Sequence, residues 1–337
     1  MPSVAMCSSK NKTMNSITTK AQFSKLQSLI ALFVLCVGIA ILSDKFLTVA
    51  NGWNVLRQIS VNICISVGMT LVVLTAGIDL SVGSILALCG AVTAGLLKNG
   101  IELPDKNLYI GFTLLGAILA GLATGSLLGW FNGWAITKFN VPPFVATLAM
   151  LTMARGFTML WTKGFPINNL GSSFDYIGTG WFLGVPVPVW ISVFVVVLAV
   201  FMTVKTPLGR YIYAIGGNEN AARLSGININ RIKIIVYSIS GALAALGGLM
   251  VTARLDSAQP NAGTSYELDA IAAVVIGGTT LSGGKGSILG TVLGAVIIGV
   301  LNNGLVLLNV SPFWQQVVKG GVILLAVIID KANSKNE

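Results

Sequence analysis

Long uncharged stretches separated by short polar segments dominate the pattern of hydrophobic and polar positions along this chain. A helix needs about 20 mostly apolar residues to cross a bilayer, and only helices and closed barrels can cross it. The stretches are continuous rather than alternating, which predicts helices and argues against a barrel. They cover residues 26–43, 58–78, 80–97, 109–137, 139–154, 176–204, 234–253, 270–284, 286–318 and 320–329.

Two of these stretches do not match a single full span. The stretch 286–318 is too long for one helix, and Ser311 followed by Pro312 is a typical helix start. The last helix is therefore expected to run from about Pro312 to Asp330. The stretch 270–284 is short and glycine-rich, which indicates a broken or partial span. The fold class is thus all-α, a polytopic membrane protein of about ten transmembrane helices.

The charged residues orient these spans, because lysine and arginine favour the cytoplasmic side. Ten spans with the amino terminus inside place Lys138, the basic segment 205–233, Lys285 and the carboxy terminus in the cytoplasm of a bacterial inner-membrane protein. One span more or fewer would put the basic segment outside. The acids expected outside are Asp44, Glu102, Asp105, Asp175, Asp256, Glu267 and Asp269.

Three regions follow from this topology. Residues 1–25 form a polar cytoplasmic tail, without a cleavage pattern after the first span, and either Met1 or Met14 is the start. Residues 26–330 form the transmembrane domain, which includes the cytoplasmic segment 205–233. Residues 331–337 form a second cytoplasmic tail.

Composition supports lipid as the solvent. Of 337 residues, 54% are hydrophobic and 9% charged, with a mean hydropathy of +0.84, whereas soluble domains carry about 25% charged residues. The 21 Lys and Arg against 11 Asp and Glu lie singly between apolar runs, so they indicate topology rather than nucleic-acid binding. The chain has no histidine, and its cysteines form no CxxC pair. We therefore expect no metal site, and we interpret Cys7, Cys36, Cys64 and Cys89 as unpaired, mainly as apolar packing residues.

The segment 205–233 has the pattern of a short helix outside the bilayer. Pro207 ends the preceding helix, and Gly216-Gly217 makes a turn. Asn218 suits an N-cap, Glu219 suits the first turn, and Gly226 ends the helix. A short, rigid helix that projects into the cytoplasm between two spans is suited to bind a cytoplasmic protein partner. An amphipathic connector anchored on lipid phosphates is the alternative.

This segment resembles the coupling loop of the ribose-type ABC transporter permeases. Residues 67–88 (VGMTLVVLTAGIDLSVGSILAL), 254–291 and LNNG at 301–304 resemble the same family, and the similarity runs from about Leu26 to Asp330. The resemblance implies a type II-like importer of a monosaccharide, most directly D-ribose, in which two permease copies form the pore. It also implies a cytoplasmic ATPase that binds ATP–Mg²⁺ and a periplasmic sugar-binding protein. By resemblance, the ATPase docks on Gly217, Asn218, Glu219, Asn220, Ala221, Ala222, Arg223 and Gly226.

The chain is not expected to bind ATP or another cofactor, or to be an enzyme by itself. The sequence GGTTLSGGKGS at 277–287 looks like a phosphate loop, but a Walker A loop needs glycine six residues before its lysine and Ser or Thr directly after it. Lys285 has Thr279 and Gly286 at those positions. The energy must come from another subunit or from an ion gradient. The alternatives are thus a secondary sugar transporter, and an ABC permease for another pentose, a galactoside or autoinducer-2.

Ionisable and amide groups in the spans are the remaining candidates for a transport role. Asp79, the one carboxylate expected in the middle of an apolar region, lies at a cytoplasmic turn where it can cap the helix beginning near Leu80. Arg155 and Lys319 are expected to pair with carboxylates or carbonyls or to reach an interface. The polar residues expected to face the bundle interior, as path or as interhelical glue, are Asn62, Thr70, Asn132, Asn302 and Asn303.

Overall fold

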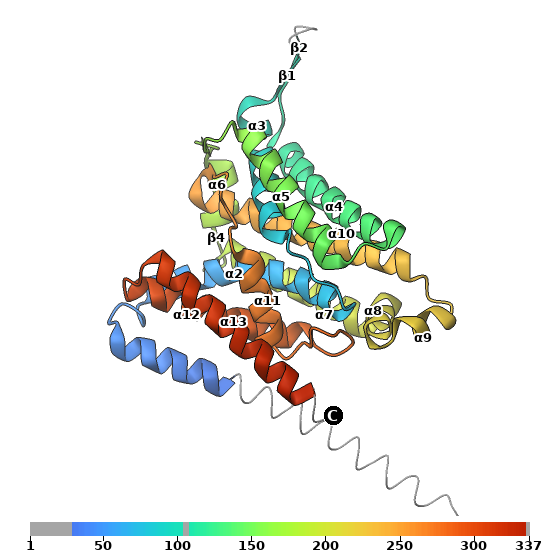
Figure 1. Cartoon of the computed structure of the whole chain (residues 1–337). Coiled ribbons are helices and arrows are strands. Elements are labelled where there is room, and N and C mark those ends of the chain that lie inside the picture. Colours follow the sequence, from blue (N-terminus) through green and yellow to red (C-terminus); the bar gives the residue numbers. More distant parts are fainter. Residues whose placement is uncertain (1–28, 104–107, 335–337) are drawn as a thin grey trace, which may run out of the picture.

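The computed structural model describes residues 29–103 and 108–334, and this part of the chain is mainly helical (Figure 1). Three short antiparallel pairs of strands, β1–β2, β3–β6 and β4–β5, join loops outside the helices. The strands are β1 (Ile101–Leu103), β2 (Leu108–Ile110), β3 (Ile167–Asn168), β4 (Trp181–Phe182), β5 (Val185–Pro186) and β6 (Ser257–Ala258). The helices are Leu29–Leu42, α2 (Val49–Leu74), α3 (Val82–Asn99), α4 (Leu114–Phe139), α5 (Pro143–Thr162), α6 (Ser172–Thr179), α7 (Val187–Lys205), α8 (Pro207–Gly217), α9 (Glu219–Leu224), α10 (Ile229–Leu255), α11 (Tyr266–Ile276), α12 (Ile288–Leu307) and α13 (Pro312–Ser334).

Seven helices within the described residues are long and apolar enough to cross a membrane: α2, α3, α4, α5, α7, α10 and α12. The predicted total of ten spans stays a prediction. The start of the last helix at Pro312 is confirmed, although α13 continues four residues past the expected end, to Ser334. The predicted tail 1–25 lies outside the described residues.

Several predicted boundaries are wrong. The stretch 176–204 is not one helix, because α6, the β4–β5 hairpin and Pro186 precede α7. The broken or partial span predicted at 270–284 is an 11-residue helix, α11, whose boundaries differ from the prediction, because it begins earlier and ends at Ile276. Its first turn contains Glu267 and Asp269, so these acids lie in a helix and not in an outside loop. Hydropathy placed these two acids in a loop because it counts only the charge itself and not the side chains that pair with that charge in the folded protein.

The core forms around α10, which packs against α4, α2 and α3. Glycine makes the α4–α10 contact close: a Cβ added to Gly129 would collide with the carbonyl oxygen of Tyr237, and one added to Gly241 would collide with that of Gly125. Small residues let helix backbones approach closely where lipid supplies no hydrophobic drive between helices. By contrast, α4, α5 and α7 expose broad apolar surfaces, as is suitable for lipid or a second copy.

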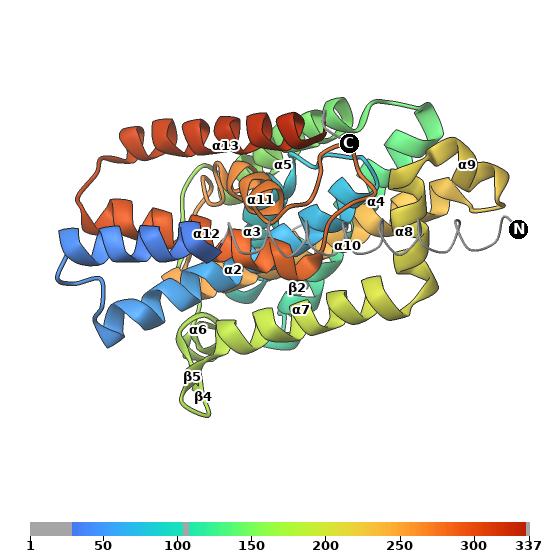
Figure 2. The same ribbon diagram turned by 90° about the horizontal axis from the view of Figure 1, so that it is seen from below.

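Connections that are far apart in sequence meet at one end of the bundle, where α8 and α9 lie (Figure 2). The backbone N–H of Gly284 donates to the carbonyl oxygen of Leu74 at 3.1 Å, and the Tyr213 hydroxyl donates to that of Gly286 at 2.9 Å. These bonds join the α11–α12 connection to the end of α2 and to α8. The basic segment 205–233 and Lys285 therefore lie at the same end, as the charge pattern predicted.

The opposite end contains the other set of connections. The amides of Asn51 and Asn303 hydrogen bond reciprocally there, at 3.0 and 2.9 Å, and tie α2 to α12. Trp53 of α2 meets Trp181 of the β4–β5 hairpin edge to face, with ring centroids 5.2 Å apart. At each end of the bundle, contacts between segments that are far apart in sequence therefore hold the connections together.

Candidate functional site

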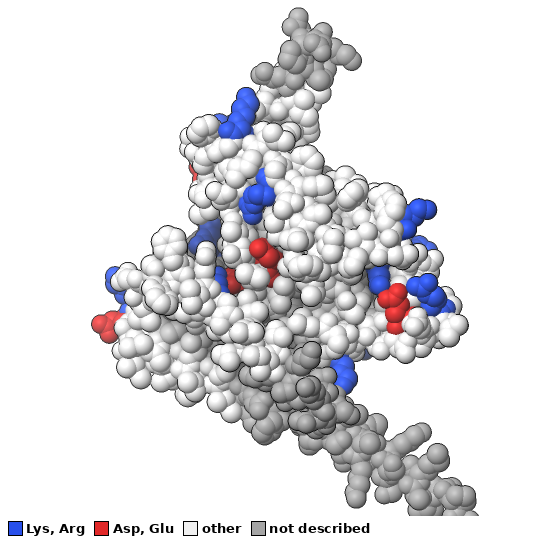
Figure 3. Space-filling view, in the orientation of Figure 1, with Lys and Arg blue, Asp and Glu red and all other residues white. Residues whose placement is uncertain are grey.

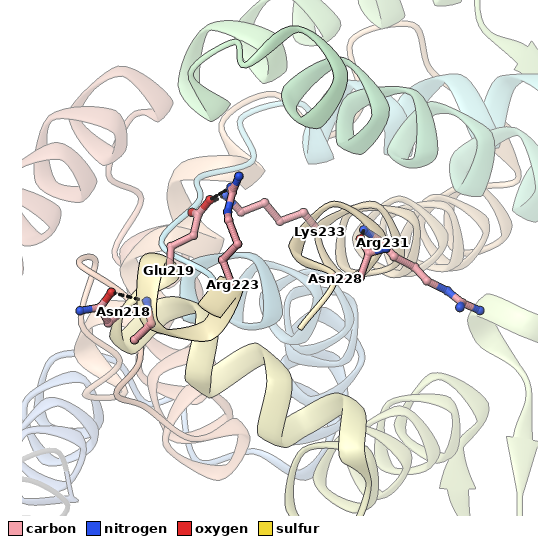
Figure 4. A network of polar contacts seen from close by, with 7 residues as sticks. Asn218, Glu219, Arg223, Asn228, Arg231 and Lys233 are labelled. Carbon is pink, nitrogen blue, oxygen red and sulfur yellow. Dashed lines mark hydrogen bonds and ion pairs between the residues drawn. The ribbon is translucent and has the colours of Figure 1, made fainter. Parts of the chain in front are cut away.

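The short helix α9 forms as its capping residues predicted (Figure 4). The Asn218 side chain accepts a hydrogen bond from the backbone N–H of Ala221 at 3.0 Å, and Glu219 lies in the first turn. Gly226 follows the helix with φ of +82°, a conformation that glycine adopts without steric cost. The predicted turn at Gly216-Gly217 is wrong in detail, because these residues complete a further helix, α8, which sequence reasoning missed.

An ion-pair cluster ties α9 to the start of α10. The Glu219 carboxylate lies 2.7 Å from Lys233 Nζ and 3.4 Å from an Arg223 nitrogen. The hydrogen bond from Lys233 is the main cause that holds the pKa of Glu219 below its ordinary value. Arg231 points away from this cluster in Figure 4. Glu219 therefore stays ionised at neutral pH and couples α9 mechanically to α10 through a short charge-assisted contact.

The surface of α9 is largely open. Most of the residues predicted for docking are exposed, whereas Glu219 is half-buried and Ala222, 4% exposed, packs inward. Leu224 is 91% exposed at the end of the helix. Beside it lies a groove of about 440 Å³, lined by Leu208, Tyr211, Ser225, Ile227, Arg231 and Ile235 among others. An exposed leucine next to an apolar groove is suited to a protein contact.

Asp79 is fully buried and fully engaged. Its Oδ1 accepts from the Ser81 backbone N–H and hydroxyl, at 3.0 and 2.6 Å, and its Oδ2 accepts from Ser240 at 2.9 Å. Asn132 in turn donates to the Ser81 hydroxyl at 2.9 Å. The predicted capping by Asp79 of a helix beginning near Leu80 is wrong in detail, because α3 begins at Val82 with Ser81 at its N-cap and no side-chain cap hydrogen bond, and Asp79 bonds Ser81 within the α2–α3 turn instead. This network joins the α2–α3 turn to α4 and α10.

Of the two alternatives left open for Arg155 and Lys319, the structure shows the first, with carbonyl or carboxylate partners inside the bundle. Arg155 Nη1 donates to the carbonyl oxygens of Pro260 and Ala262, at 2.6 and 2.9 Å. Lys319 Nζ lies 2.9 Å from Asp269 Oδ2. The view of Asp79 as the one carboxylate in an apolar region was wrong, because Asp269 is buried in α11 and binds a lysine 50 residues away.

The five polar residues predicted to face the bundle interior are all buried: Asn62, Thr70, Asn132, Asn302 and Asn303. Four of them hydrogen bond to a neighbouring helix or turn. Thr70 meets Thr291 at 2.7 Å, Asn302 donates to Asp269 at 3.2 Å, and Asn303 pairs with Asn51. Their contacts are dispersed through the bundle, which favours interhelical bonding over a shared sugar path.

Comparison with known proteins decides the family. Residues 52–327 match the family model described as a branched-chain amino acid transport system permease component. The chain belongs to this permease family. The permease is 54% identical over 316 residues to the ribose import permease protein RbsC of Escherichia coli (strain K12), which covers 93% of this chain and 95% of the relative. It is 50% identical to RbsC of Bacillus subtilis (strain 168), covering 92% and 94% of the two chains, and 40% identical to the D-allose transport system permease protein AlsC of E. coli (strain K12), covering 90% and 91%. No solved structure matches it.

Replacing Gly226 by alanine is expected to lower the free energy of local opening at the end of α9 by about 1 kcal/mol, because alanine disfavours φ of +82°. Gly217→Ala is the matched control, since a Cβ there meets nothing within 4 Å and Gly217 lies in a helix. Hydrogen exchange of the α9 amides in the purified permease measures the difference. Equal protection in both variants would show that Gly226 does not terminate the helix.

Proposed function

We propose that this permease is the transmembrane subunit of an ATP-driven ABC importer that brings D-ribose into the cytoplasm. The observation that carries the proposal is the 54% identity to an E. coli ribose import permease over 93% of the chain. Identity falls to 40% for the allose permease and to 34–35% for the xylose permeases. Ribose is therefore favoured over xylose, the other pentose compared, and over allose.

The permease lies in a bacterial inner membrane with ten spans, both termini in the cytoplasm and α9 facing the cytosol. The gathering of the basic segment 205–233 and Lys285 at one end supports this orientation, because it satisfies the positive-inside rule. The seven candidate spans, together with the shorter helices Leu29–Leu42 and α11 and the 23-residue α13, give the total of ten.

The working unit contains two copies of the permease, a cytoplasmic ATPase that binds ATP–Mg²⁺, and a periplasmic sugar-binding protein. The permease itself is not expected to bind nucleotide, because Thr279 and Gly286 stand where a phosphate loop needs glycine and a hydroxyl residue. Exposed apolar side chains along α5, such as Phe144 and Phe157, are suited to contact lipid or a second copy on that face.

Movement of the ATPase is transmitted from α9 through direct contacts. Glu219 links α9 to Lys233 of α10, so a push on α9 moves the start of α10. Gly216 of α8 contacts the backbone of Leu74 and of Gly284, so the same push reaches α2 and the α11–α12 connection. These contacts allow ATP-driven closure to switch the opening of the path from one side to the other.

Reconstitution tests the proposal. The permease is placed in liposomes with the ATPase that co-purifies with it from native membranes, and with ribose-binding protein on the outside. ATP-dependent accumulation of labelled ribose is expected with all components, and none with the permease alone. Accumulation by the permease alone under a proton or sodium gradient would instead support the secondary transporter.

A further inference from the structure

A non-helical segment descends into the bundle between α10 and α11. At one end, β6 pairs with β3, where Lys98 at the end of α3 also donates to the Asn168 carbonyl oxygen. At the other end, Gly263 lies so close to Gly83, in the first turn of α3, that a Cβ on either would collide with the carbonyl oxygen of the other. The axial distance from Gly83 to Lys98 is about 22 Å at 1.5 Å per residue. The segment therefore runs along most of the length of α3, and the first turn of α11 lies inside the helix bundle and not at its end.

The outward side of this segment is polar. Gln259, Asn261 and Thr264 are exposed, although they lie between an outer strand and a position deep in the bundle. Irregular backbone at membrane depth does not occur against lipid, and is tolerated only when it is buried in protein or lines water. These side chains are not buried within this copy of the chain, so they face water or a second copy and not lipid. On α7, by comparison, the exposed side chains are large and apolar, including Phe194 at 68%.

Two charged side chains adjoin the segment. Arg155 of α5 bonds to the carbonyl oxygens of Pro260 and Ala262, which lie outside any helix and lack helical partners. Glu267 of α11 is half-buried and interacts electrostatically with Arg155. In Figure 3 a small group of acidic and basic atoms lies near the centre of an otherwise largely uncharged face, over α5 and α11, while other charges lie toward the periphery. The opposite charges of Arg155 and Glu267 offset one another, so the surface formed by these two side chains and residues 259–264 carries little net charge.

We propose that residues 259–264, with Arg155 and Glu267, line the passage of the sugar at mid-depth and exchange hydrogen bonds with its hydroxyl groups. Exposed amides and a hydroxyl offer donors and acceptors without net charge, which suits a neutral polyol. Arg155 acts mainly as a positioning residue that fixes the backbone of the segment. Contacts that are individually weak let the sugar leave as readily as it enters. This inference rests on the proposed function.

Cysteine labelling of the assembled complex in membranes tests whether residues 259–264 face water. Asn261→Cys is made in a chain carrying Cys7→Ser and Cys36→Ser, while the fully buried Cys64 and Cys89 remain. A charged methanethiosulfonate is expected to label Asn261→Cys at least tenfold faster than Phe194→Cys, because a lipid-facing thiol does not ionise. Labelling is also expected to block ribose uptake. Equal rates at the two positions would overturn the inference.

Substitution of Arg155 tests the positioning role. Arg155→Gln is expected to change the labelling rate at Asn261→Cys several-fold and to lower ribose uptake at least tenfold, and Arg155→Lys to restore much of both. Unchanged labelling and uptake in Arg155→Gln would overturn this role. Uptake by the unsubstituted complex separates the two proposals: normal ATP-driven uptake with an unlabelled Asn261→Cys refutes the passage alone, whereas rapid labelling without ribose uptake refutes the substrate.

Discussion

Replacing Leu224 by aspartate is expected to weaken association with the ATPase at least tenfold while the permease still folds. Leu224 is 91% exposed on α9, so the change removes no internal packing. If the ATPase buries this side chain, the complex loses about 1.5–3 kcal/mol of apolar burial and must also desolvate a carboxylate. Each 1.4 kcal/mol corresponds to about a tenfold change in affinity. Co-purification of the ATPase with tagged permease measures the loss.

Leu183→Asp is the matched control. Leu183 is 77% exposed in the β4–β5 turn, at the opposite end of the bundle from α9. Aspartate at this position is expected to leave association with the ATPase unchanged, because an ATPase bound at α9 does not contact the end of the bundle that contains the β4–β5 turn. Equal loss in the two variants would point to misfolding, and no loss in Leu224→Asp would place the docking surface elsewhere.

The helix α9 could be predicted because its determinants are local. An N-cap at Asn218, an acid in the next position and a glycine after the last turn act within nine residues of each other. The helix α8 was missed because Pro207 and Gly216-Gly217 are usually breakers. Its apolar residues Ile212 and Ile215 are buried, so tertiary packing overrides the weak local preference.

The arrangement around α11 could not be predicted from hydropathy, because its determinants are far apart in the chain. Lys319 and Asp269 are 50 residues apart, and the irregular segment before α11 depends on Arg155, more than 100 residues earlier. A hydropathy window lowers its score for every charged residue, so it assigns acidic residues to loops. Only the folded bundle brings an opposite charge or a donor to each of them.

The site of Asp79 lies between these cases. A local role for Asp79 at the α2–α3 turn was predicted, although as a cap of the next helix and not as the partner of Ser81 within the turn, whereas the bond from Ser240 of α10 was not predicted. Together they explain how one buried carboxylate is held without a cation: three donors surround it, two of them within its own turn.

Replacing Lys319 by alanine is expected to destabilise the permease by about 3–5 kcal/mol, since it leaves Asp269 buried without its cation. Asp269 is only 3% exposed, and the 2.9 Å contact to Lys319 is the ion pair that joins α13 to α11. Thermal unfolding of the detergent-purified permease measures the change as a lower midpoint. Lys45→Ala, which removes an exposed lysine, is the control and should stay within about 0.5 kcal/mol.

The double variant Lys319→Met with Asp269→Leu separates the buried charge from the loss of the pair itself. Apolar residues of similar size often replace a buried ion pair without loss of stability, so this variant should recover most of the midpoint. Asn302 donates to Asp269 and would lose that bond, which limits the recovery. If Lys319→Ala unfolds no earlier than Lys45→Ala, Asp269 is not charged in the folded bundle, and α13 is held by its apolar contacts alone.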